Sequence, residues 1–148
     1  MSAAPATDAR ITAVVATRNR GDSAVMAVRS LLLSDHPSFG VVVVDQSDDD
    51  STRSALAPFE SDPRYLYIHS DTPGVGRAQN LAASMIASPL IAFTDDDCEV
   101  DAAWLVELVG TLRATDAAAA GGAQLAYPRP ERGHRPPSPA PFRRRMRT

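Results

Sequence analysis

The sequence has 148 residues, of which 44% are hydrophobic and 22% charged, and a formal net charge of −3, a composition typical of one globular domain. It contains no apolar run near the roughly 20 residues of a membrane-spanning helix, and its N-terminus lacks the features of a secretory signal. Cys98 is the only cysteine, which excludes an internal disulfide and a cysteine-based metal site. We therefore expect a cytoplasmic protein, with peripheral attachment to a membrane left open.

The first half of the chain alternates strand and helix patterns. The β-rich run at 11–17 predicts a strand, and apolar residues at helical spacing predict a helix over 23–34 that Asp22 or Ser23 caps. The β-branched run at 41–45 is typical of a strand that is covered on both faces, and a short helix over 51–59 follows it.

The second half repeats this alternation. The patterns predict strands at 65–69 and 90–94, and helices over 77–88 and 102–114. The helix over 77–88 places Ala78, Leu81, Ala82 and Met85 on one face. The stretch 117–127 is compatible with a fifth strand.

The C-terminal stretch differs in composition from the rest. Residues 128–148 are rich in proline and hold seven arginines and one acid, which gives this stretch a charge of +6 and the remainder −9. We predict an ordered domain over 9–127 and a disordered tail over 128–148. Contact of the arginines with nucleic acid or anionic lipid is an alternative, but no interleaved aromatic residues support it, and we expect no nucleic-acid partner.

The alternation of strands and helices predicts an α/β fold, a Rossmann-like, mostly parallel sheet flanked by helices. Ligands of such sheets bind beyond the carboxyl ends of the strands. The four loops predicted there are all polar: "TRNRG", "DQSDDDST", "SDTPGVGR" and "DDDCE".

Three consecutive aspartates follow the predicted strand at 90–94. Adjacent carboxylates repel one another unless a cation is near, and Asp95 and Asp97 project to the same side of an extended segment. Carboxylate oxygens suit Mg²⁺ or Mn²⁺, which usually complete their shell with water and substrate phosphates. The alternative interpretation is a solvated acidic loop.

The other loops carry softer signals. Asp45 is suited either to a nucleobase or ribose contact or to an Asx turn, and Thr17, Arg18 and Asn19 either to ligand contact or to a turn. The "PGVGR" loop brings Arg77 to a helix N-terminus, which suits a phosphate, or simply forms a tight turn.

Several common motifs are missing from the sequence. The first strand is not followed by G-x-G-x-x-G, and the chain has no lysine and therefore no P-loop. It also lacks a G-x-S-x-G nucleophile elbow, and its three histidines lack metal-ligand spacing.

The order of the motifs resembles the N-terminal half of a family 2 glycosyltransferase with the GT-A fold. The resemblance runs over about residues 10–122 and depends on "VVATRNR", "VVVVDQSDDDST", "GVGRAQNLAAS" and "IAFTDDDCEVDAAWL" in this order. It implies a nucleotide-sugar site, with a lean to UDP, and a Mg²⁺ or Mn²⁺ cofactor.

The resemblance also assigns roles to residues. Thr17 and Asp45 match positions of the nucleobase pocket, and the aspartates match the D-x-D signature, with the earlier Asp near the ribose and Asp97 on the metal. Gln46 stands where many relatives have Asp or Asn, and Gln79 stands where they have Arg. The implied nucleotide-sugar set is Thr17, Arg18, Asn19, Asp45, Gln46, Arg77, Asn80, Asp95 and Asp96.

Such enzymes transfer a sugar to an acceptor hydroxyl with inversion, and they need a general base. In the family this base follows in the second half, and no acid after Asp97 stands in a matching context. We expect a donor-binding half that binds a nucleotide weakly but does not transfer sugar alone, its acceptor unknown. The alternatives are a noncatalytic nucleotide-binding α/β domain and a GT-A nucleotidyltransferase, whose typical "G-x-G-T-R" opening this chain lacks.

Overall fold

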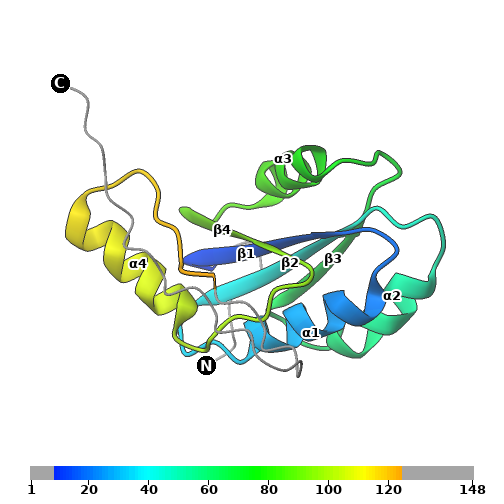
Figure 1. Ribbon diagram of the computed structural model, residues 1–148, viewed down its shortest axis with the longest axis horizontal. Helices are drawn as coiled ribbons and strands as arrows, with labels where there is room; N and C mark the ends of the chain where they lie inside the picture. Colours follow the sequence, from blue (N-terminus) through cyan, green and yellow to red (C-terminus); the bar gives the residue numbers. More distant parts are fainter. Residues whose placement is uncertain (1–8, 125–148) are drawn as a thin grey trace, which may run out of the picture.

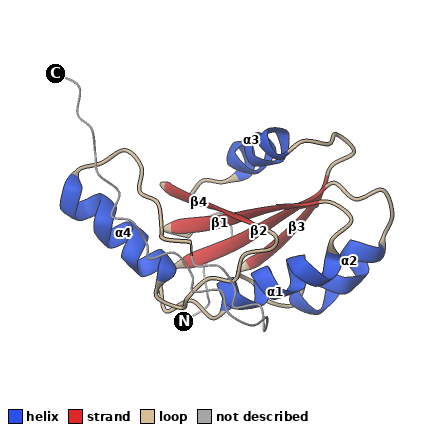
Figure 2. Cartoon of the chain, in the orientation of Figure 1, coloured by secondary structure: helices blue, strands red, loops and turns tan. Residues whose placement is uncertain are grey.

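The computed structural model describes residues 9–124. Four parallel strands form one sheet with helices on both faces (Figures 1 and 2), which confirms the predicted Rossmann-like α/β fold. The strands are β1 (Ile11–Thr17), β2 (Phe39–Asp45), β3 (Tyr65–His69) and β4 (Leu90–Asp95). The helices are α1 (Gly21–Leu32), α2 (Ser51–Leu56), the 3₁₀ turn η1 (Ala57–Phe59), α3 (Val75–Met85) and α4 (Trp104–Thr115).

The sheet has the strand order β3-β2-β1-β4, so β1 and β2 lie at its centre. Every residue of β2 is buried, as the continuous β-branched run predicts for a strand covered on both faces. The edge strands β3 and β4 are only partly buried, and Phe93 on β4 is 47% exposed.

Two hydrophobic clusters hold the helices on the sheet. One face of β1 and β2 packs against α1, α2 and α4 through side chains such as Val28, Leu56 and Leu105. Among the described helices, only α3 packs against the other face, where Ala78 and Ala82 lie against valines of the central strands. Small alanines on α3 let this helix lie close to the sheet, and Figure 1 shows it alone on that face.

Three predicted helix starts were wrong, those of α1, α3 and α4, the last of which begins at Trp104 and not at residue 102. Helix α1 begins at Gly21, its N-cap is Arg20 with no side-chain cap hydrogen bond, and Asp22 lies in the first turn. Glycine permits this early start because a Cβ at this position would lie 3.2 Å from the Cβ of Ala55 on α2. Helix α3 begins at Val75, directly after Gly74, whose φ of 126° lies in a region that favours glycine.

The C-terminal end of α3 and the segment that follows α4 also differ from the prediction. Helix α3 ends at Met85, which is 48% exposed and does not join the packed face. Residues 117–124 form no strand, since the chain leaves α4 through left-handed Asp116 into an exposed Ala- and Gly-rich segment. Residues 125–127 and the predicted tail at 128–148 lie outside the described residues. Within 9–124, no helix is long and apolar enough to cross a membrane.

Candidate functional site

The register of the sheet brings the polar ends of all four strands to one edge. Thr17 at the end of β1 lies beside Asp45 at the end of β2, and Asp45 lies beside His69 at the end of β3. On the other side of β1, Ala16 pairs with Asp95 at the end of β4. The carboxyl edge therefore gathers the loops in which the sequence predicts a ligand site.

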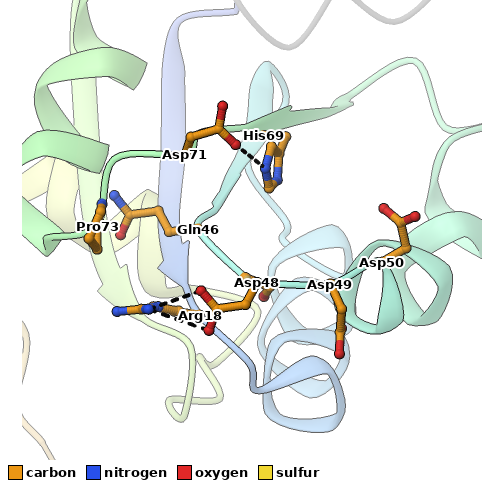
Figure 3. Close-up of a pocket in the computed structure, with 9 residues that line it drawn as sticks. Arg18, Gln46, Asp48, Asp49, Asp50, His69, Asp71 and Pro73 are labelled. Atoms are coloured by element: carbon orange, nitrogen blue, oxygen red, sulfur yellow. Dashed lines mark hydrogen bonds and ion pairs between the residues drawn. The ribbon is translucent and has the colours of Figure 1, made fainter.

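A pocket of about 480 Å³ opens at the β1, β2 and β3 side of this edge. Figure 3 shows side chains from the three loops around it. Its basic and imidazole side chains already have acidic partners, Arg18 with Asp48 and His69 with Asp71, each pair at 3.0 Å. The lining residues are Arg18, Gln46, Ser47, Asp48, Asp49, Asp50, His69, Asp71 and Pro73.

The loop after β1 is tied to the loop after β2 by Asn19. Its side-chain amide donates to Asp48 Oδ2 at 2.7 Å, and its Oδ1 accepts from the Asp48 backbone N–H at 3.0 Å. Asn19 has a φ of 54°, a left-handed conformation that asparagine tolerates well. Hydrogen bonds from Asn19 and then Arg18 hold the pKa of Asp48 below its ordinary value.

Asp45 is fully buried, and both of its carboxylate oxygens accept hydrogen bonds. Oδ1 accepts from the backbone N–H of Ser47 at 2.9 Å and from its hydroxyl, and Oδ2 accepts from the Tyr67 hydroxyl at 2.8 Å. The Asx turn that the sequence allows is therefore present. Burial and this hydrogen bond raise the pKa of Tyr67. Contact of Asp45 with a nucleobase stays a prediction.

Gln46 connects the loop after β2 to the loop before α3. Its Nε2 donates to the carbonyls of Thr72 and Gly74 at 2.6 and 3.1 Å, and its Oε1 accepts from the Gly74 N–H at 3.2 Å. Because a carboxylate has no donor, an aspartate at this position would make none of the donated bonds. Gln46 thus fixes one wall of the pocket.

The three aspartates after β4 have different environments. Asp96 is buried, and its Oδ2 accepts from the Thr17 hydroxyl at 2.8 Å while its Oδ1 pairs with Arg20 at 3.0 Å. Asp95 and Asp97 are exposed. The extended segment predicted here is wrong, because Asp96 and Asp97 form a turn that the Cys98 N–H closes on the Asp95 carbonyl at 3.2 Å. One ligand atom from each of Asp95, Asp97 and Cys98 falls within a group no more than 4.8 Å across.

Arg20 is the residue of this corner that the sequence argument missed. It also pairs with Asp97 Oδ2 at 3.0 Å, and the hydrogen bond to Asp97 and the charge of Asp96 raise the pKa of its guanidinium. Its position in "TRNRG" could have indicated this role, because a residue one position past the predicted turn still lies near the carboxyl ends of the strands.

Ser47 and Tyr67 were also missed in the sequence, because a single residue with a hydroxyl group belongs to no recognisable motif.

Arg77 and Asn80 lie exposed in the first two turns of α3. Within residues 9–124, neither side chain has an ion pair or a hydrogen bond to another side chain. The structure thus brings Thr17 and Asp96 into direct contact and links Asp97 to Asp96 through Arg20, while Arg77 and Asn80 share only the same edge.

The sequence profile of glycosyl transferase family 2 matches residues 12–148. The chain belongs to glycosyl transferase family 2. A curated relative, a glycosyltransferase of Rickettsia conorii whose name calls it uncharacterized, is 29% identical over 90 residues, which are 61% of this chain and 15% of that protein. The chain therefore spans a small part of the length of this family 2 relative.

Solved structures show the same GT-A fold. S. aureus TarS 1–349 in complex with UDP-GlcNAc matches 78% of this chain with a TM-score of 0.63 and 20% identity, over 37% of its own length. A mannosyltransferase from Pyrobaculum calidifontis in complex with GDP-Man and Mn²⁺ matches 75% of this chain with a TM-score of 0.64 and 25% identity, over 34% of its length.

The aspartate corner of this family 2 domain fits a divalent cation. Asp95 and Asp97 offer exposed carboxylate oxygens that lie close together, and a guanidinium already occupies a cation position on Asp97. Burial, and then the charges of Asp97 and Asp95, raise the pKa of the Cys98 thiol. A protonated thiol is a poor ligand for a hard cation, so the two carboxylates are the suitable donors.

Proposed function

We propose that the domain binds a nucleoside-diphosphate sugar across the carboxyl edge of the sheet, with the base in the pocket and the diphosphate at the aspartate corner. One observation carries this proposal. The same edge holds an acidic pocket whose basic groups are already paired and, beside it, a carboxylate pair whose only ion-paired cation, within residues 9–124, is the side chain Arg20. These two environments suit the two chemically different ends of such a ligand.

The pocket suits an uncharged base better than a phosphate. Four aspartates line it, and Arg18 is engaged by Asp48. A phosphate placed there would be repelled by the carboxylates, whereas a base can use the backbone and amide groups of the walls. Thr17, Asn19, Asp45 and Gln46 would then act through the shape of the pocket that they hold.

The aspartate corner suits the diphosphate and a metal. We assign Asp97 as the ligand of Mg²⁺ or Mn²⁺ and Asp95 to the ribose, with Asp96 fixing both from the buried side. We assign Arg77 and Asn80, in the first two turns of α3, to the border of the diphosphate, where backbone N–H groups of the helix N-terminus also favour phosphate. A bound divalent cation would neutralise charge on the departing diphosphate.

The reaction we propose is transfer of the sugar to an acceptor hydroxyl with inversion at the anomeric carbon. This reaction needs a base that takes the hydroxyl proton, and we assign no residue within 9–124 to this role. The isolated chain is therefore expected to bind the donor without forming glycosylated product.

The proposal is tested by calorimetric titration of the chain with UDP, GDP and dTDP, each with and without Mn²⁺. We expect binding that depends on Mn²⁺ and that Asp97→Asn abolishes. Asp116→Asn is the matched control, because it removes one exposed carboxylate beyond α4 and keeps a residue that tolerates the left-handed conformation. Turnover of any nucleotide sugar by the isolated chain would contradict the missing base.

The same titration separates the second candidate, a noncatalytic nucleotide-binding domain. The pocket is compatible with this second candidate, because a pocket whose basic groups are already paired would bind a nucleobase without a metal. Binding of UDP that neither Mn²⁺ nor Asp97→Asn changes would favour this candidate over the transferase.

A further inference from the structure

The guanidinium of Arg20 bridges two aspartates that differ in burial. One nitrogen pairs with Asp96 Oδ1 and the other with Asp97 Oδ2, both at 3.0 Å. The side chain of Asp96 is 6% exposed, that of Asp97 is 55% exposed, and that of Arg20 is 50% exposed. A planar guanidinium can hold both partners at once because its N–H groups form a rigid fork.

The two ends of this bridge have different strengths. Asp96 is buried and also accepts from Thr17, so removing Arg20 from it would leave a buried charge with one partner fewer. Asp97 lies in solvent, where an ion pair contributes little and exchanges readily. The Asp97 end is therefore the one that a competing cation can displace.

A divalent cation on Asp97 would compete with Arg20 for the same carboxylate. The cation carries twice the charge, and it would also draw on Asp95, which has no ion pair with Arg20. Arg20 would stay anchored through Asp96 and would gain free N–H groups next to the metal. Guanidinium N–H groups bind phosphate oxygens in the same forked geometry that they use for carboxylates.

We propose that Arg20 exchanges partners during donor binding: it holds Asp97 in the metal-free chain, yields Asp97 to the divalent cation and then binds the diphosphate of the nucleotide while it remains anchored on Asp96. This inference rests on the function proposed above and adds a phosphate-binding residue to it. It makes Arg20 unfavourable for binding of the metal alone and favourable for binding of the metal with the nucleotide.

Arg20→Gln tests this exchange, because the two effects have opposite signs. We expect Mn²⁺ alone, followed by its electron paramagnetic resonance signal, to bind about three- to ten-fold more tightly once the competing positive charge is gone. At saturating Mn²⁺, UDP should bind about ten-fold more weakly, since a charge-assisted hydrogen bond to the diphosphate is lost. The affinity for uridine should stay within about two-fold, because uridine has no phosphate.

Two further variants keep the result interpretable. Arg29→Gln removes the same charge from an exposed position near the end of α1 and should match the wild type in every titration. Arg20→Lys keeps the charge and loses the fork, so Mn²⁺ affinity should change little while UDP affinity falls. This variant carries the test if Arg20→Gln does not fold.

The outcomes separate the two proposals. Weaker or unchanged Mn²⁺ binding in Arg20→Gln, or unchanged UDP binding, overturns the exchange. If this happens while the wild type binds Mn²⁺ through Asp97, the proposed function stands and only the role of Arg20 is lost. If the wild type binds no Mn²⁺, or Asp97→Asn binds it equally well, the metal site itself is wrong and the exchange is overturned with it.

Discussion

Of the two strands that flank β1, β2 ends in the buried Asp45, and the buried Asp96 follows the last residue of β4. The two aspartates are held differently. Within residues 9–124, Asp45 at the end of β2 accepts hydrogen bonds only from uncharged donors, the backbone and side chain of Ser47 and the hydroxyl of Tyr67. Asp96 after β4 accepts from Thr17 and pairs with the guanidinium of Arg20. Hydrogen bonds from uncharged donors hold the loop after β2 in one conformation, whereas the half-exposed guanidinium of Arg20 can exchange one charged partner for another. We infer that the β2 end is a structural support, and we propose that the charge of a ligand is bound at the β4 end.

Removing the carboxylate of Asp45 should have the largest effect on stability. Asp45→Ala leaves the Ser47 N–H and the Tyr67 hydroxyl without their acceptor in a buried site, which we expect to cost about 3 kcal/mol of unfolding free energy. Urea unfolding measures this loss.

Two variants bracket that result. Asp45→Asn keeps an acceptor oxygen and should lose less than Asp45→Ala. Asp71→Ala removes a carboxylate that is 98% exposed and contacts His69, so it should unfold at nearly the wild-type urea concentration. Equal losses in Asp45→Ala and Asp71→Ala would show that Asp45 is not a structural support.

The second largest effect is expected at Gln46. Gln46→Glu keeps an acceptor for the Gly74 N–H but has no donors for the carbonyls of Thr72 and Gly74, so we expect a loss of about 2 kcal/mol. Hydrogen exchange should become faster for the amides of residues 70–76, which form the pocket wall and the start of α3.

Gln79→Glu makes the same chemical change on α3 and serves as the control. Gln79 makes no side-chain hydrogen bond to another residue of the described range, so its replacement should leave exchange of this loop unchanged. If the two variants exchange alike, the loop is held by something other than the Gln46 amide.

The sequence predicts the strands and the edge of the sheet well, for a physical reason. Hydrophobic periodicity depends on burial. Every residue of β2 and every residue of β1 except Ala16 is buried, so the ends of these strands at Thr17 and Asp45 were placed correctly. Helix starts were less predictable, because the early start of α1 depends on the close approach of Gly21 to α2.

The contacts within the site were the least predictable. The hydrogen bond from Arg20 to Asp97 joins residues 77 positions apart in the chain, and the spacing of the sequence gives no indication of it. Gln46 looked like a departure from a binding motif, whereas the structure shows that its amide is used within the chain.

A smaller loss of stability is expected when the uncharged hydroxyl of Thr17 is removed from the aspartate corner. Thr17→Val keeps the shape of the side chain but removes the hydrogen bond to buried Asp96, and we expect it to cost about 1 kcal/mol by thermal or urea unfolding. Thr94→Val on β4 is the control, since Thr94 is partly buried and makes no side-chain hydrogen bond to another residue of the range 9–124. A loss no larger than that of Thr94→Val would contradict a supporting role for Thr17.

The smallest effect is expected on the pKa of Asp48. Its carboxylate accepts hydrogen bonds from the uncharged amide of Asn19 and from the charged guanidinium of Arg18. Its pKa lies below the ordinary value of 3.8, first because of the Asn19 amide and then because of Arg18. A carboxyl group with a lowered pKa stabilises the folded chain above about pH 4, and this contribution is lost as the pH falls through the lowered value. Carbon-13 NMR of the Asp48 carboxyl group measures the pKa directly.

Two variants rank the two donors. Asn19→Gly removes the amide and keeps a residue that tolerates the left-handed backbone, so it should raise the pKa of Asp48 more than Arg18→Gln does. A larger rise in Arg18→Gln would mean that charge, and not the neutral amide, governs this side of the edge. A charged donor would then govern Asp48 in the pocket, as Arg20 does Asp96 at the aspartate corner. The contrast between uncharged and charged donors would then apply to Asp45 and not to the rest of the loop after β2.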